Sequence, residues 1–221
     1  MLSSEIIDIP IFPLSNVVFF PNTLLPLHIF EDRYCRMVSE SLDQERRIGM
    51  VLVKPGGESG KPLIPDHYSI GSLGVISDYK ELEDGEFDIM LSGVCRFRIL
   101  SLVTVSPYIT ARVSIIDEDF EQEYEDEEAL QELLTCYRQL TKETGVDENL
   151  LRFLEDGDFP TVVNALCSSL PIAAQDKQSL LELDSIRNRA EEMLSIMGVL
   201  LDQRDLVSHF RHLRPDDPSK N

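Results

Sequence analysis

The spacing of apolar runs between residues 69 and 116 constrains the fold more than any other feature of the sequence. Four β-branched or aromatic runs follow one another here, separated only by Gly, Asp and Pro turns, at residues 70–77, 87–91, 95–105 and 108–116. Strands that follow one another without helices between them pair antiparallel, and a small sheet of this kind commonly curls into a barrel. The sequence therefore predicts a curled antiparallel sheet.

The residues before this region fit the same prediction. The apolar run 6–14 contains Pro10 and Pro13, which cannot donate ladder hydrogen bonds, so we expect it at an edge or a bend of the sheet. After it the sequence predicts a loop with Pro21 and Pro26, an amphipathic helix over 31–42 and a buried strand over 48–53.

The pattern changes at residue 117. Residues 117–132 hold ten carboxylates and no basic side chain, and apolar residues then recur at helical spacing from Leu130 to Leu140. Carboxylates are stabilising at the start of a helix, so this run is interpreted as the entry of a helix. Further helices are predicted at 148–155, 160–170, 175–182 and 185–207.

The predicted fold class is α+β, with two subdomains. A β-rich subdomain, a curled sheet or pseudo-barrel, spans residues 1–116, and an all-helical bundle spans residues 117–207. Residues 208–221 form a tail that is predicted to be disordered at its end, because it has little apolar surface to bury.

The charge of the chain excludes one class of partner. Forty acidic and 20 basic residues give a net charge of -20, and nucleic-acid binding needs a basic face, so no nucleic-acid partner is expected. The four cysteines form no C-x-x-C pair, which argues against a zinc site or a disulfide lattice. A basic leader and a long apolar span are both missing from the sequence, so we expect a cytoplasmic protein without membrane contact.

Motifs of catalysis and cofactor binding fail in detail. The run from Gly56 to Lys61 looks like a phosphate loop, but Pro55 stands where the first Gly belongs and Pro62 replaces the magnesium-binding hydroxyl. Ser92 precedes Gly93 without a nucleophile-elbow motif, so a turn or bulge serine is the interpretation. The sequence therefore predicts no catalytic residue, no metal site and no cofactor.

An ordered series of segments then resembles a known family, the N-terminal substrate-binding domain of the ATP-dependent protease Lon. The segments that carry the resemblance are 9–14 (IPIFPL), 17–21 (VVFFP), 25–34 (LPLHIFEDRY), 70–76 (IGSLGVI), 91–99 (LSGVCRFRI), 107–113 (PYITARV), 166–171 (LCSSLP) and 176–182 (DKQSLLE). Together they run through roughly residues 5–206, and their order is more specific than any single motif.

The resemblance implies a β-rich subdomain followed by a helical one, and binding of unfolded or exposed apolar polypeptide segments. The ATPase and serine-lysine protease domains of full-length Lon have no counterpart in the sequence, so we expect a stand-alone, non-catalytic protein that delivers substrates to a separate protease or regulates it. The alternative is an acidic scaffold that recognises one folded partner through the helical half, where residues 117–221 carry 25 acidic and 10 basic side chains, a net charge of -15.

Candidate contact residues for an extended peptide are Val17, Val18, Phe19 and Phe20, together with the proline-bearing first strand. The run is apolar enough to form a binding patch. It is also apolar enough to belong to the core, and the sequence leaves that choice open.

Overall fold

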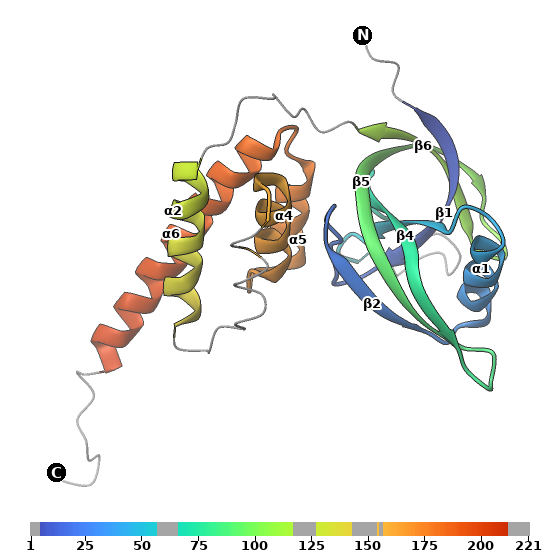
Figure 1. Ribbon diagram of the computed structural model, residues 1–221, viewed down its shortest axis with the longest axis horizontal. Helices are drawn as coiled ribbons and strands as arrows, with labels where there is room; N and C mark the ends of the chain where they lie inside the picture. The colour runs from blue at the N-terminus through green and yellow to red at the C-terminus, as the bar shows by residue number, and fades with distance from the viewer. Residues whose placement is uncertain (1–4, 57–65, 117–126, 143–153, 155–156, 212–221) are drawn as a thin grey trace, which may run out of the picture.

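The chain folds into two lobes that lie side by side in the computed structural model (Figure 1). The structure describes residues 5–56, 66–116, 127–142, 154 and 157–211. We call the described residues up to 116 the barrel lobe and those from 127 onward the helical lobe. A β-rich part followed by a helical part confirms the predicted fold class, whereas the predicted boundary at residue 117 falls outside the described residues.

A six-stranded sheet forms the barrel lobe, in the order β2-β5-β4-β3-β1-β6. A further pairing of β5 with β6 closes it into the predicted pseudo-barrel. The strands are β1 (Ile6–Leu14), β2 (Leu24–Ile29), β3 (Arg47–Leu52), β4 (Ile70–Glu81), β5 (Phe87–Thr104) and β6 (Ile109–Ile116).

The sheet is mixed and not wholly antiparallel as predicted. β1 and β3 pair parallel, because β2 and the helix α1 (Asp32–Leu42) lie between them in sequence and return the chain to the same end of the sheet. The other strand pairs are antiparallel.

The expected edge position of the first strand is wrong, because β1 lies between β3 and β6. Its prolines are tolerated since the two neighbours pair with different halves of it. Pro10 lies opposite Thr110 of β6, before pairing with β3 begins at Ile11. Pro13 lies opposite Val51 of β3, after pairing with β6 has ended. The nitrogen of each proline, which has no hydrogen to donate, can therefore face the side of β1 that has no partner strand at that residue.

Two further strand predictions need correction. Residues 24–29, predicted as loop because of Pro26, form β2, which pairs antiparallel with β5. The runs at 87–91 and 95–105 form one continuous strand, β5, with a bulge at Val94 where the register to β4 shifts. A long bulged strand can pair with β2 at its start and with β6 at its end.

The helical lobe contains α2 (Glu127–Thr141), α4 (Phe159–Ser169), α5 (Ala174–Glu182) and α6 (Ile186–Arg211). These confirm the helices predicted around Leu130, at 160–170, at 175–182 and at 185–207. Asp158 caps α4 by accepting a hydrogen bond from the Thr161 N–H. Apart from Leu154, the predicted helix at 148–155 lies outside the described residues, as do most of the acidic run at 117–132 and the end of the tail.

One apolar cluster continues from the helical lobe into the barrel lobe. Val18, Phe20, Leu52 and Ile70 of the barrel pack in the same cluster as Leu166, Leu181 and other buried side chains of the helices. In Figure 1, α4 and α5 lie on the side of the helical lobe that faces the barrel.

Hydrogen bonds from fully buried side chains reinforce this joint. The Arg96 guanidinium of β5 donates to the carbonyls of Leu181 (2.9 Å), Leu183 (2.6 Å) and Asp184 (3.0 Å) at the end of α5. The Gln178 amide of α5 donates to the Ile70 carbonyl of β4 at 3.0 Å. The two lobes are therefore joined by polar as well as apolar contacts.

Candidate functional site

The four candidate residues of the sequence lie between β1 and β2, and most of their surface faces the interior. Val18, Phe19 and Phe20 are 6%, 4% and 0% exposed, whereas Val17 is 40% exposed. The Ser72 hydroxyl holds the Phe19 carbonyl at 2.5 Å, so the backbone here is fixed to β4 as well. Three of the four side chains therefore belong to the core, and only Val17 is exposed enough to contact a ligand.

The rejected catalytic motifs gain no support from the structure. Most of the Gly56–Lys61 loop lies outside the described residues. Ser92 lies within β5, between Leu24 of β2 and Val75 of β4 and close to the bulge at Val94. Among the described residues, no three His, Cys, Asp or Glu side chains lie close enough together to hold a metal ion. Within that same part of the chain, no helix has the length and apolar character needed to span a membrane.

The most open part of the barrel is the edge formed by β2, which has one partner strand, β5, among the described residues. The Gly93 N–H donates to the Thr23 carbonyl at 2.9 Å, at the start of this ladder. Hydrogen-bonded pairs recur at every second residue of an antiparallel ladder. Leu24, Pro26 and His28 therefore direct their backbone groups away from β5, toward the free edge.

Apolar side chains line the same edge. Leu24 is 65% exposed, Pro26 is exposed, and Phe30, directly after β2, is 63% exposed. The ring of Phe30 stacks near that of His28, with 6.1 Å between their centroids. We call residues Leu24, Pro26, His28 and Phe30 the β2 strip.

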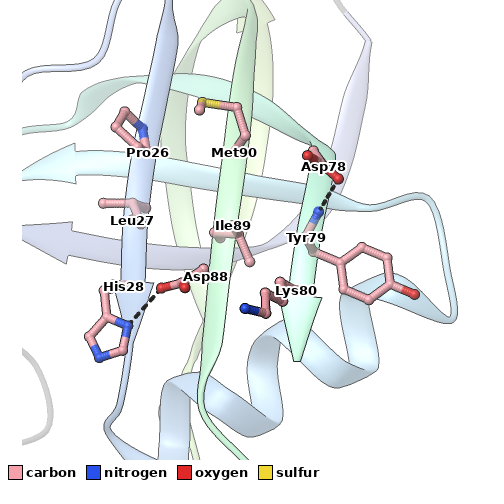
Figure 2. Close-up of a pocket in the computed structure, with 9 residues that line it drawn as sticks. All are labelled: Pro26, Leu27, His28, Asp78, Tyr79, Lys80, Asp88, Ile89 and Met90. Atoms are coloured by element: carbon pink, nitrogen blue, oxygen red, sulfur yellow. Dashed lines mark hydrogen bonds and ion pairs between the residues drawn. The ribbon is translucent and has the colours of Figure 1, made fainter. Parts of the chain in front are cut away.

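A groove of about 470 Å³ lies beside this strip, over β2, β5 and β4. Figure 2 shows the residues that line it. They form three cross-strand rows, which are Pro26 with Met90 and Asp78, Leu27 with Ile89 and Tyr79, and His28 with Asp88 and Lys80. Successive residues of a strand alternate between its two faces, so the first and third rows share one face.

Negative charge surrounds the end of the groove at His28. The His28 ring lies 3.0 Å from a Glu86 carboxylate oxygen through Nε2 and 2.8 Å from an Asp88 oxygen through Nδ1. The hydrogen bond to Asp88, and the charges of both carboxylates, raise the pKa of His28 above its usual value. Asp88 lies near the start of β5, and Glu86 lies directly before that strand, in the β4–β5 connection.

These features together suit an extended polypeptide. An unpaired strand edge offers backbone hydrogen bonds, exposed apolar side chains offer contact area, and a groove accepts side chains at alternate positions. The missing N–H of Pro26 leaves the edge partly blunted, which guards a sheet against pairing with copies of itself.

The sequence analysis does not identify this surface, because Pro26 favours the prediction of a loop at these residues. A signal was nevertheless present. Pro26 and His28 alternate with the apolar residues Leu25, Leu27 and Ile29, which is the two-residue period of a strand with one face toward the core. A proline in such a run is typical of an edge strand.

Comparisons with known proteins agree with this architecture. The chain matches the family model of the ATP-dependent protease La (LON) substrate-binding domain over residues 8–198. It is 30% identical over 196 residues to the Lon protease of Parabacteroides distasonis, a match that covers 86% of this chain and 24% of that protein. It is 23% identical over 211 residues to the Lon protease of Escherichia coli, covering 95% of this chain and 27% of that protein. The chain thus spans about a quarter of the length of these relatives.

Solved structures show the same fold. The crystal structure of a Lon N-terminal domain protein from Xanthomonas campestris has a TM-score of 0.63 and 25% identity, and covers 86% of this chain and 98% of that one. The N terminal domain of Lon protease from the Mycobacterium avium complex has a TM-score of 0.67 with the same coverage and 12% identity, a likeness of fold alone.

Proposed function

The chain belongs to the Lon substrate-binding domain family, and from this premise we propose that it is a non-catalytic module that binds extended apolar segments of other polypeptides along the β2 strip. The observation that carries the proposal is the open edge of β2, because it combines unpaired backbone groups with exposed apolar side chains. Family membership supports a polypeptide as the ligand, and the open edge of β2 supports this surface as its place of binding.

Binding in this mode adds a strand to the sheet. The backbone of the bound segment pairs with the outward groups of Leu24 and His28. Its side chains on the solvent-facing side contact Leu24 and Phe30 and extend over the groove on that same face. Because backbone pairing is independent of sequence, one surface can accept many clients. Val17, 40% exposed, is the one member of the predicted run that is available for such contact.

Fluorescence anisotropy with a set of labelled, unfolded apolar peptides tests the proposal. We expect the wild-type chain to bind them, and a L24S/F30S double variant to bind about ten-fold more weakly, because two apolar contacts are lost. The matched control is V199S/L206S, which removes two similarly exposed side chains from α6, 52% and 59% exposed, and leaves binding unchanged. Equal weakening by both variants would remove the site, and binding no better than that of a folded acidic control protein would remove the function.

The cellular role that we propose is delivery of the bound polypeptide to a separate protease in the cytoplasm. Support comes from the matched relatives, which are proteases and carry this domain as about a quarter of their length. Degradation of an unfolded protein by a Lon-type protease, with and without this chain, tests the role. A change in rate that L24S/F30S abolishes supports delivery or regulation, and an unchanged rate contradicts both.

A scaffold that recognises one folded partner through the acidic helical half is the competing function. Seven of its 25 acidic side chains lie in residues 117–126, outside the described residues. Charge-driven docking weakens as salt rises, whereas capture of apolar segments survives it. Peptide binding that persists at high salt therefore favours the β2 strip over the scaffold.

A further inference from the structure

The groove beside the β2 strip carries a charge pattern that apolar binding alone leaves unused. Residues 78–88, which form the β4–β5 hairpin and its flanks, hold six acidic side chains and one basic one, Lys80. Two of these acids, Glu86 and Asp88, converge on the His28 ring from 3.0 Å and 2.8 Å. The side chains of His28, Glu86 and Asp88 are 52%, 30% and 55% exposed, so a ligand can reach them from solvent.

The negative charge extends from this cluster to the start of α1. Burial raises the pKa of the Cys35 thiol, and the charges of Glu86, Asp32 and Asp84 raise it further. These carboxylates come from the hairpin and from the first turn of α1, so they flank the His28 end of the groove from two elements. These carboxylates therefore offer a cation a complementary surface at that end, which Lys80 of β4 also lines.

The apolar and the acidic parts of the groove share one face and have a fixed separation. Pro26 and Met90, with Asp78 beyond them on β4, form the apolar row. His28 and Asp88, with Lys80 beyond them on β4, form the charged row two residues further along the strands. A two-residue step along an extended chain covers roughly 7 Å and returns the side chain to the same face. A bound strand can thus place an apolar side chain over the apolar row and a cation over the charged row.

We infer that the groove selects extended segments in which a Lys or Arg follows or precedes an apolar residue by two positions, with the cation held by Glu86 and Asp88. This inference rests on the proposed function and names the class of polypeptide that the site prefers. His28 occupies the space between the two carboxylates in the free protein. At neutral pH a Lys or Arg carries its full charge, so it competes for the carboxylates with the imidazole.

Three host peptides of equal length and apolar content test the inference, with Lys, Gln or Glu placed two positions from a Leu. We expect the Lys peptide to bind roughly three- to ten-fold more tightly than the Glu peptide, with the Gln peptide between them. A fourth peptide has the composition of the Lys peptide but places the Lys one position from the Leu. Its side chain then faces away from the carboxylates, and we expect it to lose most of the preference.

A pair of charge variants separates the groove from the overall charge of the chain. E86Q/D88N removes the two carboxylates and should bring the Lys, Gln and Glu peptides to similar affinities. E127Q/E128Q makes the same change in net charge at exposed positions in the first turn of α2 and should keep the preference of the wild type. Both pairs of positions lie at the surface, so folding is checked by the thermal transition of each variant.

The outcomes distinguish this inference from the function on which it rests. Equal binding of all four peptides by the wild type overturns the selectivity and leaves the β2 strip as a general apolar site. A preference that survives in E86Q/D88N also overturns it, because the cation then responds to net charge alone. If no peptide binds, the proposed function fails and the inference fails with it.

Discussion

The barrel lobe and the helical lobe satisfy their polar backbone in different ways. In the barrel, each strand bonds to other strands, including the distant pairs β1–β6 and β2–β5. The β5–β6 pairing closes the sheet and leaves β2 as an open edge among the described strands. In the helical lobe, each helix bonds within itself, and the difficulty moves to the helix ends. The joint between the lobes forms where a helix end in the helical lobe meets a charged side chain from the barrel lobe.

That helix end is the C-terminus of α5. Two fully buried arginines donate to its carbonyls, Arg96 from the barrel lobe and Arg189 from α6. Arg189 donates to the Leu180 carbonyl at 3.1 Å and to the Asn164 side-chain oxygen at 2.6 Å. A cation at a helix C-terminus is stabilised by the helix dipole as well as by its hydrogen bonds. The carbonyls at the C-terminus of α5 therefore offset the cost of burying both arginine charges.

Removing the shared arginine is the largest expected perturbation of this comparison. R96A leaves three carbonyls near the end of α5 without their charged donor, and we expect the free energy of unfolding to fall by about 3–5 kcal/mol. Urea unfolding followed by circular dichroism measures it. R98A, which changes an exposed arginine two residues further along β5, is the control and should change stability by less than about 0.5 kcal/mol. Equal effects of R96A and R98A would show that the joint is apolar only.

The barrel lobe depends on close backbone approach more than the helical lobe does. A Cβ at Gly71 of β4 would lie 2.2 Å from the Met50 carbonyl oxygen of β3, which is backbone and cannot rotate away. We expect G71A to destabilise the protein by roughly 3 kcal/mol, at the upper end of the cost of overpacking. Urea unfolding measures this as well, and a loss below about 0.5 kcal/mol would mean that the two strands separate easily.

The matching glycine of the helical lobe should respond in the opposite direction. Gly198 lies within α6, and a Cβ there would meet nothing within 4 Å. We expect G198A to raise the free energy of unfolding by roughly 0.5–1 kcal/mol, because Ala has less backbone freedom to lose in a helix. A midpoint of thermal unfolding below that of the wild type would contradict this difference between the lobes.

The smallest expected effect concerns charge at the barrel surface. Solvent screens the electrostatic interactions there, whereas the interactions of the buried Arg96 are stronger. Asp88 and Glu86 raise the pKa of His28, so NMR titration should give a value above the ordinary 6.5. Because the folded pKa is raised, the stabilising contribution is complete below the unfolded pKa and is lost as the pH rises through the folded pKa. D88N should lower the His28 pKa, whereas E127Q should not. A wild-type value at or below 6.5 would place the carboxylates too far from the ring in solution.

Strand and helix patterns predicted the lobes well, since periodicity is a local property of the chain. The apolar spacing at Leu133, Leu134 and Tyr137 predicted a buried helix face, and these residues are at most 7% exposed. The predictions of an edge strand at Pro10 and Pro13 and of a loop at Pro26 were wrong. A proline fits in a strand when its nitrogen faces the side that has no partner strand. That side is set by pairing with distant strands, which a local pattern does not contain.

The binding surface divides in the same way. The family resemblance indicated a polypeptide ligand, and the run from Val17 to Phe20 was apolar enough to be either core or patch. The fold decided for the core at Phe19 and Phe20, because this segment packs beneath β4 and β5. Leu24 on the neighbouring strand β2, and Phe30 directly after that strand, stay exposed.

The sequence by itself determined the fold class, the family and most element positions, because each rests on apolar periodicity or on motifs that neighbouring residues spell out. The tertiary structure alone decided which strand edge stays open, which carboxylates meet His28, and that Arg96 reaches the end of α5. These side-chain contacts join residues 58 to 88 positions apart, so they follow from how the sheet closes and how the lobes dock.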